Sequence, residues 1–257
     1  MAKPISDVSL TDAYLTNAAV DAHRNDPVLG YRFIADELAE AGHAVSERRV
    51  WRLCSQQRLF SVFSKKAGPR RRPGPPVHDD LVARRFTATR PNQLWLTDIT
   101  EHRTGEDKLY LCAIKDVYSN RIVGYSIGKR MKASLAVAAL PMAIARRNPV
   151  ATVVHSDRGS QFRSTRYVRT LAHNGLIGSM GRVGACADNA AMESFFSLLQ
   201  NNVLDTRSWA TRQDLRLAII TWTERTYHRR RRQRTLGKLT PIEYDTLHQA
   251  ATATAAA

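Results

Sequence analysis

Trp95-Leu96-Thr97-Asp98-Ile99-Thr100 places one carboxylate in the middle of a segment rich in aromatic and β-branched residues. Such a composition predicts a strand, which we expect over residues 94–104. Successive side chains of a strand point to opposite faces, so Leu96 and Asp98 share a face and the carboxylate points towards the end or edge of the sheet. An isolated carboxylate in an apolar segment is costly to desolvate, and Asp98 is therefore a candidate functional residue.

Turn signals divide the segment that follows into further strands. Gly105-Glu106-Asp107 and Ser119-Asn120 separate apolar runs at 109–117 and 121–127, which predicts an antiparallel meander. The later elements that we expect are a helix at 133–147, a strand at 152–155, a helix from Ser164 to about 173, a strand at 176–180, a helix opened by Asp188 or Asn189, and a helix at 212–227. This order predicts a ribonuclease H-like α/β fold, in which a mixed five-stranded sheet carries helices on both faces.

A helical region, expected between residues 11 and 60, precedes the strands. Apolar residues recur there at steps of three and four before Gly42, and Ser46 is a suitable N-cap for a second helix. The basic residues of the second helix that we expect to contact DNA are Arg48, Arg49 and Arg52. A helix, a short turn and a basic helix form the outline of a helix-turn-helix unit. The alternative is a helical hairpin whose basic residues are only solvated.

An excess of basic residues indicates a polyanionic partner. The chain has 39 Lys and Arg against 23 Asp and Glu, a formal net charge of +16 and a pI near 10.4. Such a charge supplies salt-sensitive affinity for nucleic acid. The Pro- and Gly-rich segment 65–76 predicts a linker. The further residues that we expect to contact DNA are Lys65, Lys66, Arg70, Arg71, Arg72, Asn189, Gln200, Arg229, Arg230 and Arg231.

Cysteine usage argues against a disulfide framework and against a zinc site. Cys54, Cys112 and Cys186 are far apart and odd in number, and none belongs to a Cys-x-x-Cys pair. The N-terminal residues form no apolar signal region, and no run approaches the length of about 18 apolar residues that a membrane span needs. We therefore expect a cytoplasmic protein without a membrane partner, associated with the nucleoid through its basic charge.

Two more acidic residues lie beside apolar segments. Asp157 belongs to His155-Ser156-Asp157-Arg158-Gly159-Ser160-Gln161, directly after a predicted strand, and Glu193 belongs to Asp188-Asn189-Ala190-Ala191-Met192-Glu193, one turn into a predicted helix. Taken singly, Asp98 could be a surface strand residue, Asp157 a turn former and Glu193 a first-turn acid favoured by the helix dipole. Taken together, the three carboxylates predict a site for hard Mg²⁺ or Mn²⁺ ions, of the two-metal kind used in phosphoryl transfer.

Two further polar residues are weaker candidates. His155 precedes Asp157 by two residues and could assist near a scissile phosphate, although a packed histidine is an equal alternative. Asp116 could be another ligand, but an acid in a turn is the favoured interpretation. We expect Trp95 and Trp222 to be core residues.

The segments around the three acids resemble the catalytic core of retroviral-integrase-type DDE transposases. The resemblance is closest to the downstream-frame (orfB) transposases of bacterial copy-out, paste-in insertion sequences. It rests on Trp-x-Thr-Asp-Ile-Thr, His-Ser-Asp-x-Gly-Ser-Gln and Asp-Asn-Ala-x-x-Glu-Ser-Phe-Phe, and on a tail that runs from Tyr227 to Gly237. Gly30-Tyr31-Arg32 with Val45-Ser46 is similar to the upstream helix-turn-helix of the family. The match spans roughly residues 28–246.

This resemblance implies a transposase that uses Asp98, Asp157 and Glu193 to hold two Mg²⁺ or Mn²⁺ ions. It implies metal-dependent phosphodiester cleavage followed by strand transfer, with double-stranded DNA as both element end and target. It also implies self-association on DNA and an upstream-frame partner or fusion. The expected organisation is a helix-turn-helix-like region at 1–62, a linker at 63–90, a catalytic core at 91–205 and a basic helical extension at 206–257.

One departure from the family pattern is Gln200, which stands where such transposases usually carry Lys or Arg, seven residues after the catalytic Glu. In a regular α-helix this residue shares a face with Glu193. Gln brings no charge to DNA near the acids. The alternative function is therefore a catalytically impaired downstream-frame protein that binds DNA and regulates its element.

Overall fold

The computed structural model describes residues 7–61, 77–181 and 190–247. The chain divides into two compact units, of which the first contains residues 1–66 and 197–206 and the second contains residues 67–196 and 207–257. The predicted linker residues from Lys65 to Arg72, and the helix-opening residues Asp188 and Asn189, lie outside the described residues. Among the described helices, none combines the length and the apolar character that crossing a bilayer requires.

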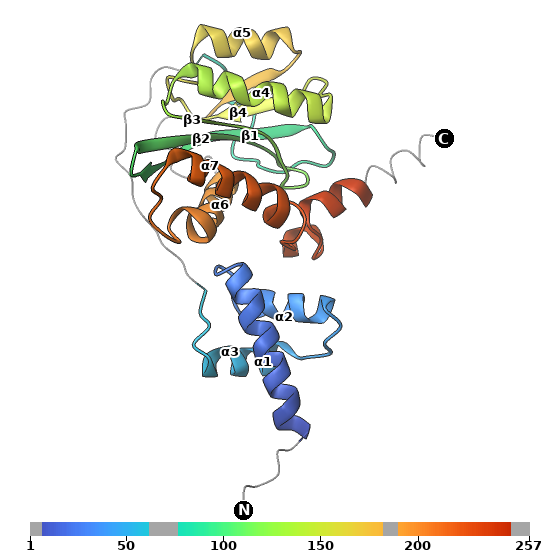
Figure 1. Cartoon of the computed structure of the whole chain (residues 1–257). Coiled ribbons are helices and arrows are strands. Elements are labelled where there is room, and N and C mark those ends of the chain that lie inside the picture. Colours follow the sequence, from blue (N-terminus) through green and yellow to red (C-terminus); the bar gives the residue numbers. More distant parts are fainter. Residues whose placement is uncertain (1–6, 62–76, 182–189, 248–257) are drawn as a thin grey trace, which may run out of the picture. The chain divides into compact units, whose positions relative to one another are not determined.

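The first unit begins with three helices, α1 (Asp7–Asn25), α2 (Tyr31–Glu40) and α3 (Glu47–Gln56). Ile34 and Leu38 of α2 pack with Val50 and Cys54 of α3 in one buried cluster, so each helix turns one apolar face inward. The Ser46 hydroxyl accepts a hydrogen bond from the Arg49 backbone N–H at 3.3 Å and caps α3, as its sequence position predicts. The helix, turn and basic helix are confirmed (Figure 1).

The second unit is built on a five-stranded sheet in the order β3-β2-β1-β4-β5. The strands are β1 (Leu94–Thr104), β2 (Asp107–Asp116), β3 (Ile122–Gly128), β4 (Val153–Ser156) and β5 (Ile177–Met180). The first three strands form the predicted antiparallel meander, whereas β4 is parallel to β1 and β5 is parallel to β4. The predicted mixed sheet is therefore correct, with the Asp98 strand at its centre.

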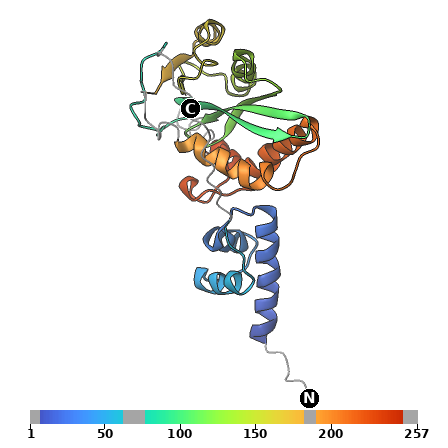
Figure 2. The same cartoon turned by 90° about the vertical axis from the view of Figure 1, so that its left-hand side faces the viewer.

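One face of the sheet carries helices α4 (Ala133–Arg147) and α5 (Thr165–His173) (Figures 1 and 2). Trp95 of β1 and Ile114 of β2 belong to the buried cluster that these helices complete. Gly124 of β3 allows α4 to come close, because a Cβ at this position would lie 2.5 Å from the Ala139 carbonyl oxygen. Side chains alternate along β1, so Leu96, the residue after Trp95, points to the opposite face of the sheet. Asp98 lies two residues after Leu96 and points to the same face as Leu96.

That opposite face carries α6 (Ala190–Leu199) and α7 (Arg212–Thr221), as the two views show (Figures 1 and 2). Phe195 of α6 is buried and packs edge-on against Tyr227 and beside Trp222. Trp95 and Trp222 are both buried, which confirms their prediction as core residues. The predicted helix at 212–227 is α-helical only to Thr221 and continues as a π-helix from Trp222 to Tyr227, a wider turn that local sequence did not indicate.

The C-terminal part of the second unit is fixed to the sheet by buried polar contacts. Arg147, at the end of α4, bonds to Asp116 at 2.7 Å and to Asp245 at 2.7 Å, and all three side chains are almost fully buried. The ring of His228 accepts a hydrogen bond from the Ile122 backbone N–H at 3.1 Å. These contacts join segments that are far apart in sequence, and they hold the tail against β2, β3 and α4.

Candidate active site

The parallel pairing of β1 with β4 brings Asp98 and Asp157 to neighbouring positions. Leu96 of β1 is paired with His155 of β4, the last pair between these two strands. Asp98 follows Leu96 by two residues and Asp157 follows His155 by two residues, so both acids lie just beyond the carboxyl end of the paired region. Adjacent strands lie about 4.8 Å apart, and residues two positions on return to the same face. The register therefore places the two carboxylates side by side.

The surroundings of Asp98 disfavour its charged form. Burial, and secondly repulsion by Asp157 with a smaller contribution from Glu193, raise the pKa of Asp98 to about 7, although a hydrogen bond from the Ile99 backbone N–H opposes the shift. That bond, 2.7 Å long, uses Oδ1 of the carboxylate. Asp98 is partly exposed to solvent. Asp98 is thus accessible and electrostatically coupled to both other acids.

Asp157 lies in the loop that follows β4, held by a turn of its own. Its Oδ1 accepts the Gly159 backbone N–H at 2.9 Å. A Cβ at position 159 would lie 2.9 Å from that oxygen, so a glycine leaves the carboxylate room. Gln161 then ties the loop to the Met131 carbonyl oxygen at 3.2 Å. Partial burial raises the pKa of Asp157, and the bond from Gly159 opposes the shift.

Glu193 lies in the first turn of α6, with an exposed side chain. Phe195, two residues on, is buried among aromatic side chains, which turns this part of the helix towards the second unit's core. Repulsion by Glu193 is the smallest of the causes that raise the pKa of Asp98, so the Glu193 carboxylate lies within electrostatic reach of Asp98. Gln200 begins a π-helical segment (Gln200–Leu204), so the regular α-helical spacing after Glu193 ends at Leu199.

The next question is which positive charges lie near these three carboxylates. Within the described residues, none of them forms an ion pair with an arginine or lysine. Carboxylate oxygens are the ligands that hard divalent cations prefer, so Asp98, Asp157 and Glu193 are the side chains that could hold such an ion. In the part of the chain that is described, however, no three acidic, histidine or cysteine side chains are close enough to hold one ion as they stand.

The two weaker candidates have structural roles. His155 is buried, its Nδ1 lies 2.9 Å from the Ser179 Oγ, and its ring meets Phe86 edge-on. Asp116 is fully buried, binds Arg147, and accepts the Tyr118 backbone N–H at 3.0 Å as an acid in a turn does. Both residues therefore follow the structural interpretation.

One buried cation near the site was not singled out from the sequence. Lys115 of β2 is only 4% exposed, and its Nζ donates to the Ala191 carbonyl oxygen at 3.0 Å. The signal that could have identified it is a lysine at the end of the apolar run Leu111-Cys112-Ala113-Ile114. Burial lowers the pKa of Lys115 to about 8.

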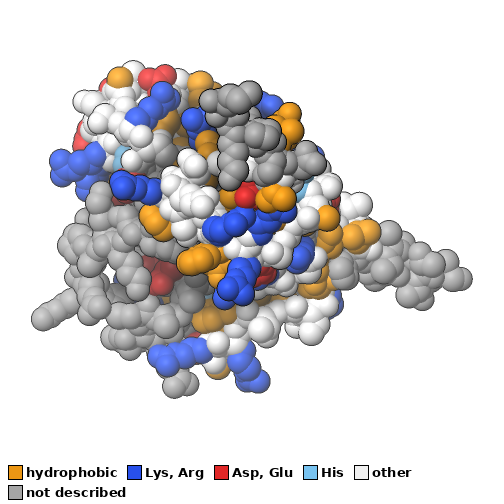
Figure 3. All heavy atoms as spheres, turned by 90° about the horizontal axis from the view of Figure 1, so that it is seen from below, with side chains coloured by type: hydrophobic (Ala, Val, Ile, Leu, Met, Phe, Trp, Pro, Cys, Tyr) orange, Lys and Arg blue, Asp and Glu red, His pale blue; other side chains and the backbone are white. Residues whose placement is uncertain are grey.

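The residues predicted to contact DNA differ in their exposure. Arg48 is exposed, whereas Arg49 and Arg52 each bind Asp12 of α1 at 2.8 Å. Arg229 and Arg230 are exposed in the second unit. Basic side chains are scattered over the face in Figure 3, with few acidic ones between them.

Arg231 differs from Arg229 and Arg230 in its exposure. Its side chain is buried, and burial lowers its pKa to about 10. A run of consecutive arginines does not reveal which member turns inward. Arg231 is therefore less accessible to a phosphate backbone than Arg229 and Arg230, and its contact with DNA stays a prediction.

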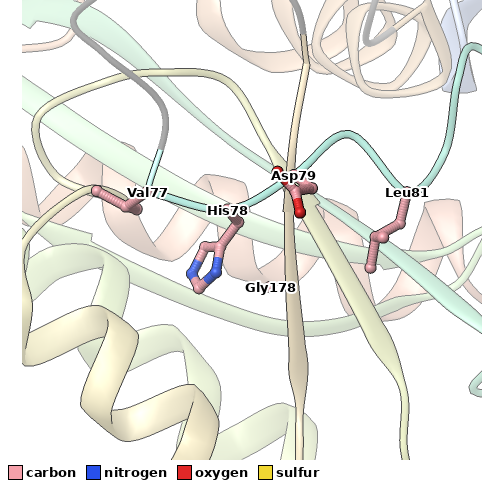
Figure 4. Close-up of a pocket in the computed structure, with 5 residues that line it drawn as sticks. All are labelled: Val77, His78, Asp79, Leu81 and Gly178. Atoms are coloured by element: carbon pink, nitrogen blue, oxygen red, sulfur yellow. The ribbon is translucent and has the colours of Figure 1, made fainter.

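A hollow of about 450 Å³ lies at the β5 edge of the sheet (Figure 4). Val77, His78, Asp79 and Leu81 form one wall, and the imidazole of His78 lies against Gly178 of β5. The Met180 backbone N–H bonds to the Asp79 carbonyl oxygen at 3.2 Å. This segment therefore covers the edge strand, and its hollow contains none of the three candidate acids.

Family models match three stretches of the chain. An integrase core domain model matches residues 88–186, a second integrase core domain model matches residues 174–241, and an HTH-like domain model matches residues 12–67. The three acids fall within the two core matches, and α2 and α3 fall within the HTH-like match.

Curated relatives span most of the chain. Transposase InsF for insertion sequence IS3A of Escherichia coli (strain K12) is 37% identical over 215 residues, which cover 82% of this chain and 75% of that protein. The insertion element IS600 uncharacterized 31 kDa protein of Shigella sonnei is 38% identical over 251 residues, which cover 96% of this chain and 92% of that protein.

Solved structures share the fold at low sequence identity. The HTLV-2 integrase catalytic core domain in complex with magnesium has a TM-score of 0.50 and 17% identity, covering 62% of this chain and 99% of that one. The simian T-cell lymphotropic virus intasome in complex with PP2A regulatory subunit B56 gamma has a TM-score of 0.54 and 16% identity, covering 88% of this chain and 72% of that one. The sheet and its helices are thus those of an integrase catalytic core.

Proposed function

This chain belongs to the family of insertion-sequence transposases with an integrase core domain, and we propose that it cleaves and joins DNA strands through Asp98, Asp157 and Glu193. Transposition is the function that family membership gives the chain, and phosphoryl transfer on a polynucleotide is the kind of reaction it performs. The single observation that supports the choice of acids is the parallel pairing of β1 with β4, which ends at Leu96 and His155 and brings Asp98 next to Asp157.

The proposed ligands fit a divalent cation by their chemistry. Three carboxylates that repel one another, with no arginine or lysine partner within the described residues, are stabilised when positive charge is added. When bound, Mg²⁺ or Mn²⁺, as one ion or two, would activate the attacking hydroxyl and stabilise the departing oxygen. Because no three of the described acids hold an ion as they stand, we expect ion binding to require a small adjustment of these side chains.

The chain's own residues prepare this site. Gly159 and Ile99 each donate a backbone N–H to one carboxylate oxygen, which fixes the direction of Asp157 and Asp98. Our proposal needs no covalent intermediate between the protein and DNA, and therefore no side-chain nucleophile. A water molecule would therefore attack the phosphodiester first, and the freed 3′-hydroxyl would attack the target strand second.

For DNA binding, we propose that Arg48 of α3 and Arg229 and Arg230 of the tail contact phosphates. All three side chains are exposed, and the net charge of +16 favours a polyanion. Arg49 and Arg52 are already paired with Asp12, so they contribute less charge to DNA. Self-association on paired ends and an upstream-frame partner belong to the same proposal, and nuclease footprints on the element ends would test the DNA contacts.

The test is a strand-cleavage and strand-transfer assay on element-end DNA with Mg²⁺ or Mn²⁺. Asp157→Asn and Glu193→Gln should each abolish product while leaving DNA binding unchanged, since each substitution removes one negative charge and keeps the shape. Ser160→Ala, in the same loop, is the matched control and should retain activity. Full activity in both acid variants would refute the assignment of the site.

A second candidate function is a regulator that binds DNA without cutting it. The observation in its favour is Gln200, which gives no positive charge and starts a π-helical segment rather than a further α-helical turn. Wild-type protein that binds element ends but yields no product with either ion would support this function. Gln200→Lys should then raise DNA affinity and product together if the missing charge is the cause.

A further inference from the structure

We propose that Lys115 is a positioning residue for Glu193, because its buried ammonium anchors the first turn of α6 to the sheet. The inference deepens the proposed function and rests on the role given there to Glu193. Lys115 itself touches none of the reacting groups in this proposal, and it acts through the backbone of the helix.

The strand register directs Lys115 to the correct face. Lys115 is paired with Leu96 across the β1–β2 ladder, and Asp98 shares the face of Leu96. The Nζ of Lys115 reaches the carbonyl oxygen of Ala191 at 3.0 Å. Ala191 precedes Glu193 by two residues within the same first helical turn. One hydrogen bond therefore joins the strand beside Asp98 to the turn that carries Glu193.

The second anchor of α6 lies further along the helix. Phe195 is buried against Tyr227 and Trp222, with ring centroids 5.0 Å and 6.2 Å away. Met192 and Leu199 of α6 are also fully buried, so apolar packing acts along the helix, but such packing has no preferred direction. The bond from Lys115 adds a directional contact on the opposite side of Glu193 in the sequence, and the two contacts together fix where the Glu193 side chain points.

The energetics distinguish this lysine from an ordinary core residue. Its ammonium is buried and, within the described residues, makes no ion pair, so a single neutral carbonyl oxygen must compensate for the lost hydration. An apolar side chain of similar size does not carry this desolvation cost. The buried ammonium of Lys115 therefore lowers the free energy of unfolding. Its function in our proposal is the hydrogen bond to the helix that carries Glu193.

Lys115→Met tests the proposal, because methionine has a similar length and no donor. The full chain should keep or increase its resistance to urea in the absence of metal. Mn²⁺ binding, followed by calorimetry, should weaken by roughly 10- to 100-fold, the usual effect of losing a group that orients a ligand. Strand transfer should fall by a similar factor, and Lys115→Arg, which keeps the donor, should restore both.

Ser126→Ala is the matched control. Ser126 of β3 donates to the Leu135 carbonyl oxygen of α4, which is the same kind of strand-to-helix bond on the face that carries no candidate acid. This variant should lose some stability in urea and bind Mn²⁺ as the wild type does.

Two results would overturn the role of Lys115. One is a Lys115→Met protein that binds Mn²⁺ and transfers strands like the wild type. The other is a loss of urea resistance large enough to account for the loss of activity, since that describes a structural role alone. Failure of the underlying function is separate: wild type and Glu193→Gln would then bind Mn²⁺ equally, whatever Lys115→Met does.

Discussion

Two groups of acids lie in the same unit, and among the described residues only one of the groups is paired with arginine. At the end of α4, Asp116 and Asp245 share Arg147, with each N–O distance at 2.7 Å. Asp98 lies within β1 and Asp157 directly after β4, just beyond the last paired residues of these two strands, and Glu193 adds its repulsion from α6. None of the three has an arginine or lysine partner among the described residues.

The difference teaches how to separate structural acids from candidate catalytic ones. A buried carboxylate is tolerated when an opposite charge and hydrogen bonds compensate for its lost hydration. The Arg147 group satisfies that condition internally, so it stabilises the fold and has no need of a ligand. The Asp98 group does not, and its uncompensated charge suits a cation from solution.

The largest expected effect concerns the uncompensated group. Asp98→Asn should lower strand transfer by at least about 1,000-fold, in the range found when a main electrostatic contribution to a transition state is removed. Its free energy of unfolding without metal should stay constant or rise, because a source of repulsion is lost. Product assays and urea unfolding measure the two quantities, and a large loss of stability in this variant would break the comparison.

The compensated group should respond in the opposite way. Arg147→Met leaves Asp116 buried without its cation and leaves Asp245 with Arg121 alone, so it should cost about 3–5 kcal/mol of unfolding free energy. Arg146→Met is the control: Arg146 is partly exposed and paired with Glu224, so we expect a cost of no more than about 1 kcal/mol. Equal costs for the two variants in urea unfolding would contradict the distinction.

The pH dependence of stability sharpens the comparison further. The pKa of Asp98 is raised from 3.8 to about 7 in the folded chain, so its stabilising protonation is complete below pH 3.8 and is lost as pH rises through about 7. Between these values the metal-free protein should lose up to about 1.4 kcal/mol per pH unit through this group. Urea unfolding from pH 5 to 8 should show a flatter profile for Asp98→Asn, whereas parallel profiles would argue against the shift.

The smallest effect is expected in the first unit, where Asp12 is an acid with two arginine partners on the surface. Asp12→Asn should cost at most about 1 kcal/mol of stability, because both pairs are partly exposed. Arg49 and Arg52 then become available, so DNA affinity should rise at low salt and the difference should shrink as salt is added. Fluorescence anisotropy at several salt concentrations measures this change, and an unchanged affinity would exclude these arginines from the interface.

Much of the fold was predictable because its signals are local. The strand at 94–104 and the helix at 133–147 were predicted with the bounds that β1 and α4 have. Alternation, turn residues and helix caps depend on neighbours in sequence, and the hydroxyls of Ser46 and Ser164 cap helices as expected. The π-helical turn from Trp222 was missed, since its width is set by packing rather than by composition.

The candidate site was predictable in its members and less so in its surroundings. Motifs around Asp98, Asp157 and Glu193 identified the three acids. The burial of Arg231, the pairing of Arg49 with Asp12 and the bond from Lys115 to Ala191 had no local signal. Each of these depends on which side of a helix or strand another segment covers, and no short window of sequence contains both partners.

The sequence by itself determined that the chain carries an integrase-type α/β core with three acids beside apolar segments. Only the tertiary structure decided which acids are neutralised and which are not. Asp98 and Asp116 lie on neighbouring strands, and each is followed by a β-branched apolar residue. The parallel pairing of Leu96 with His155 nevertheless gives Asp98 another carboxylate as its neighbour. The docking of α4 gives Asp116 an arginine. Charge compensation depends on distances between segments remote in sequence, and those distances are set by packing.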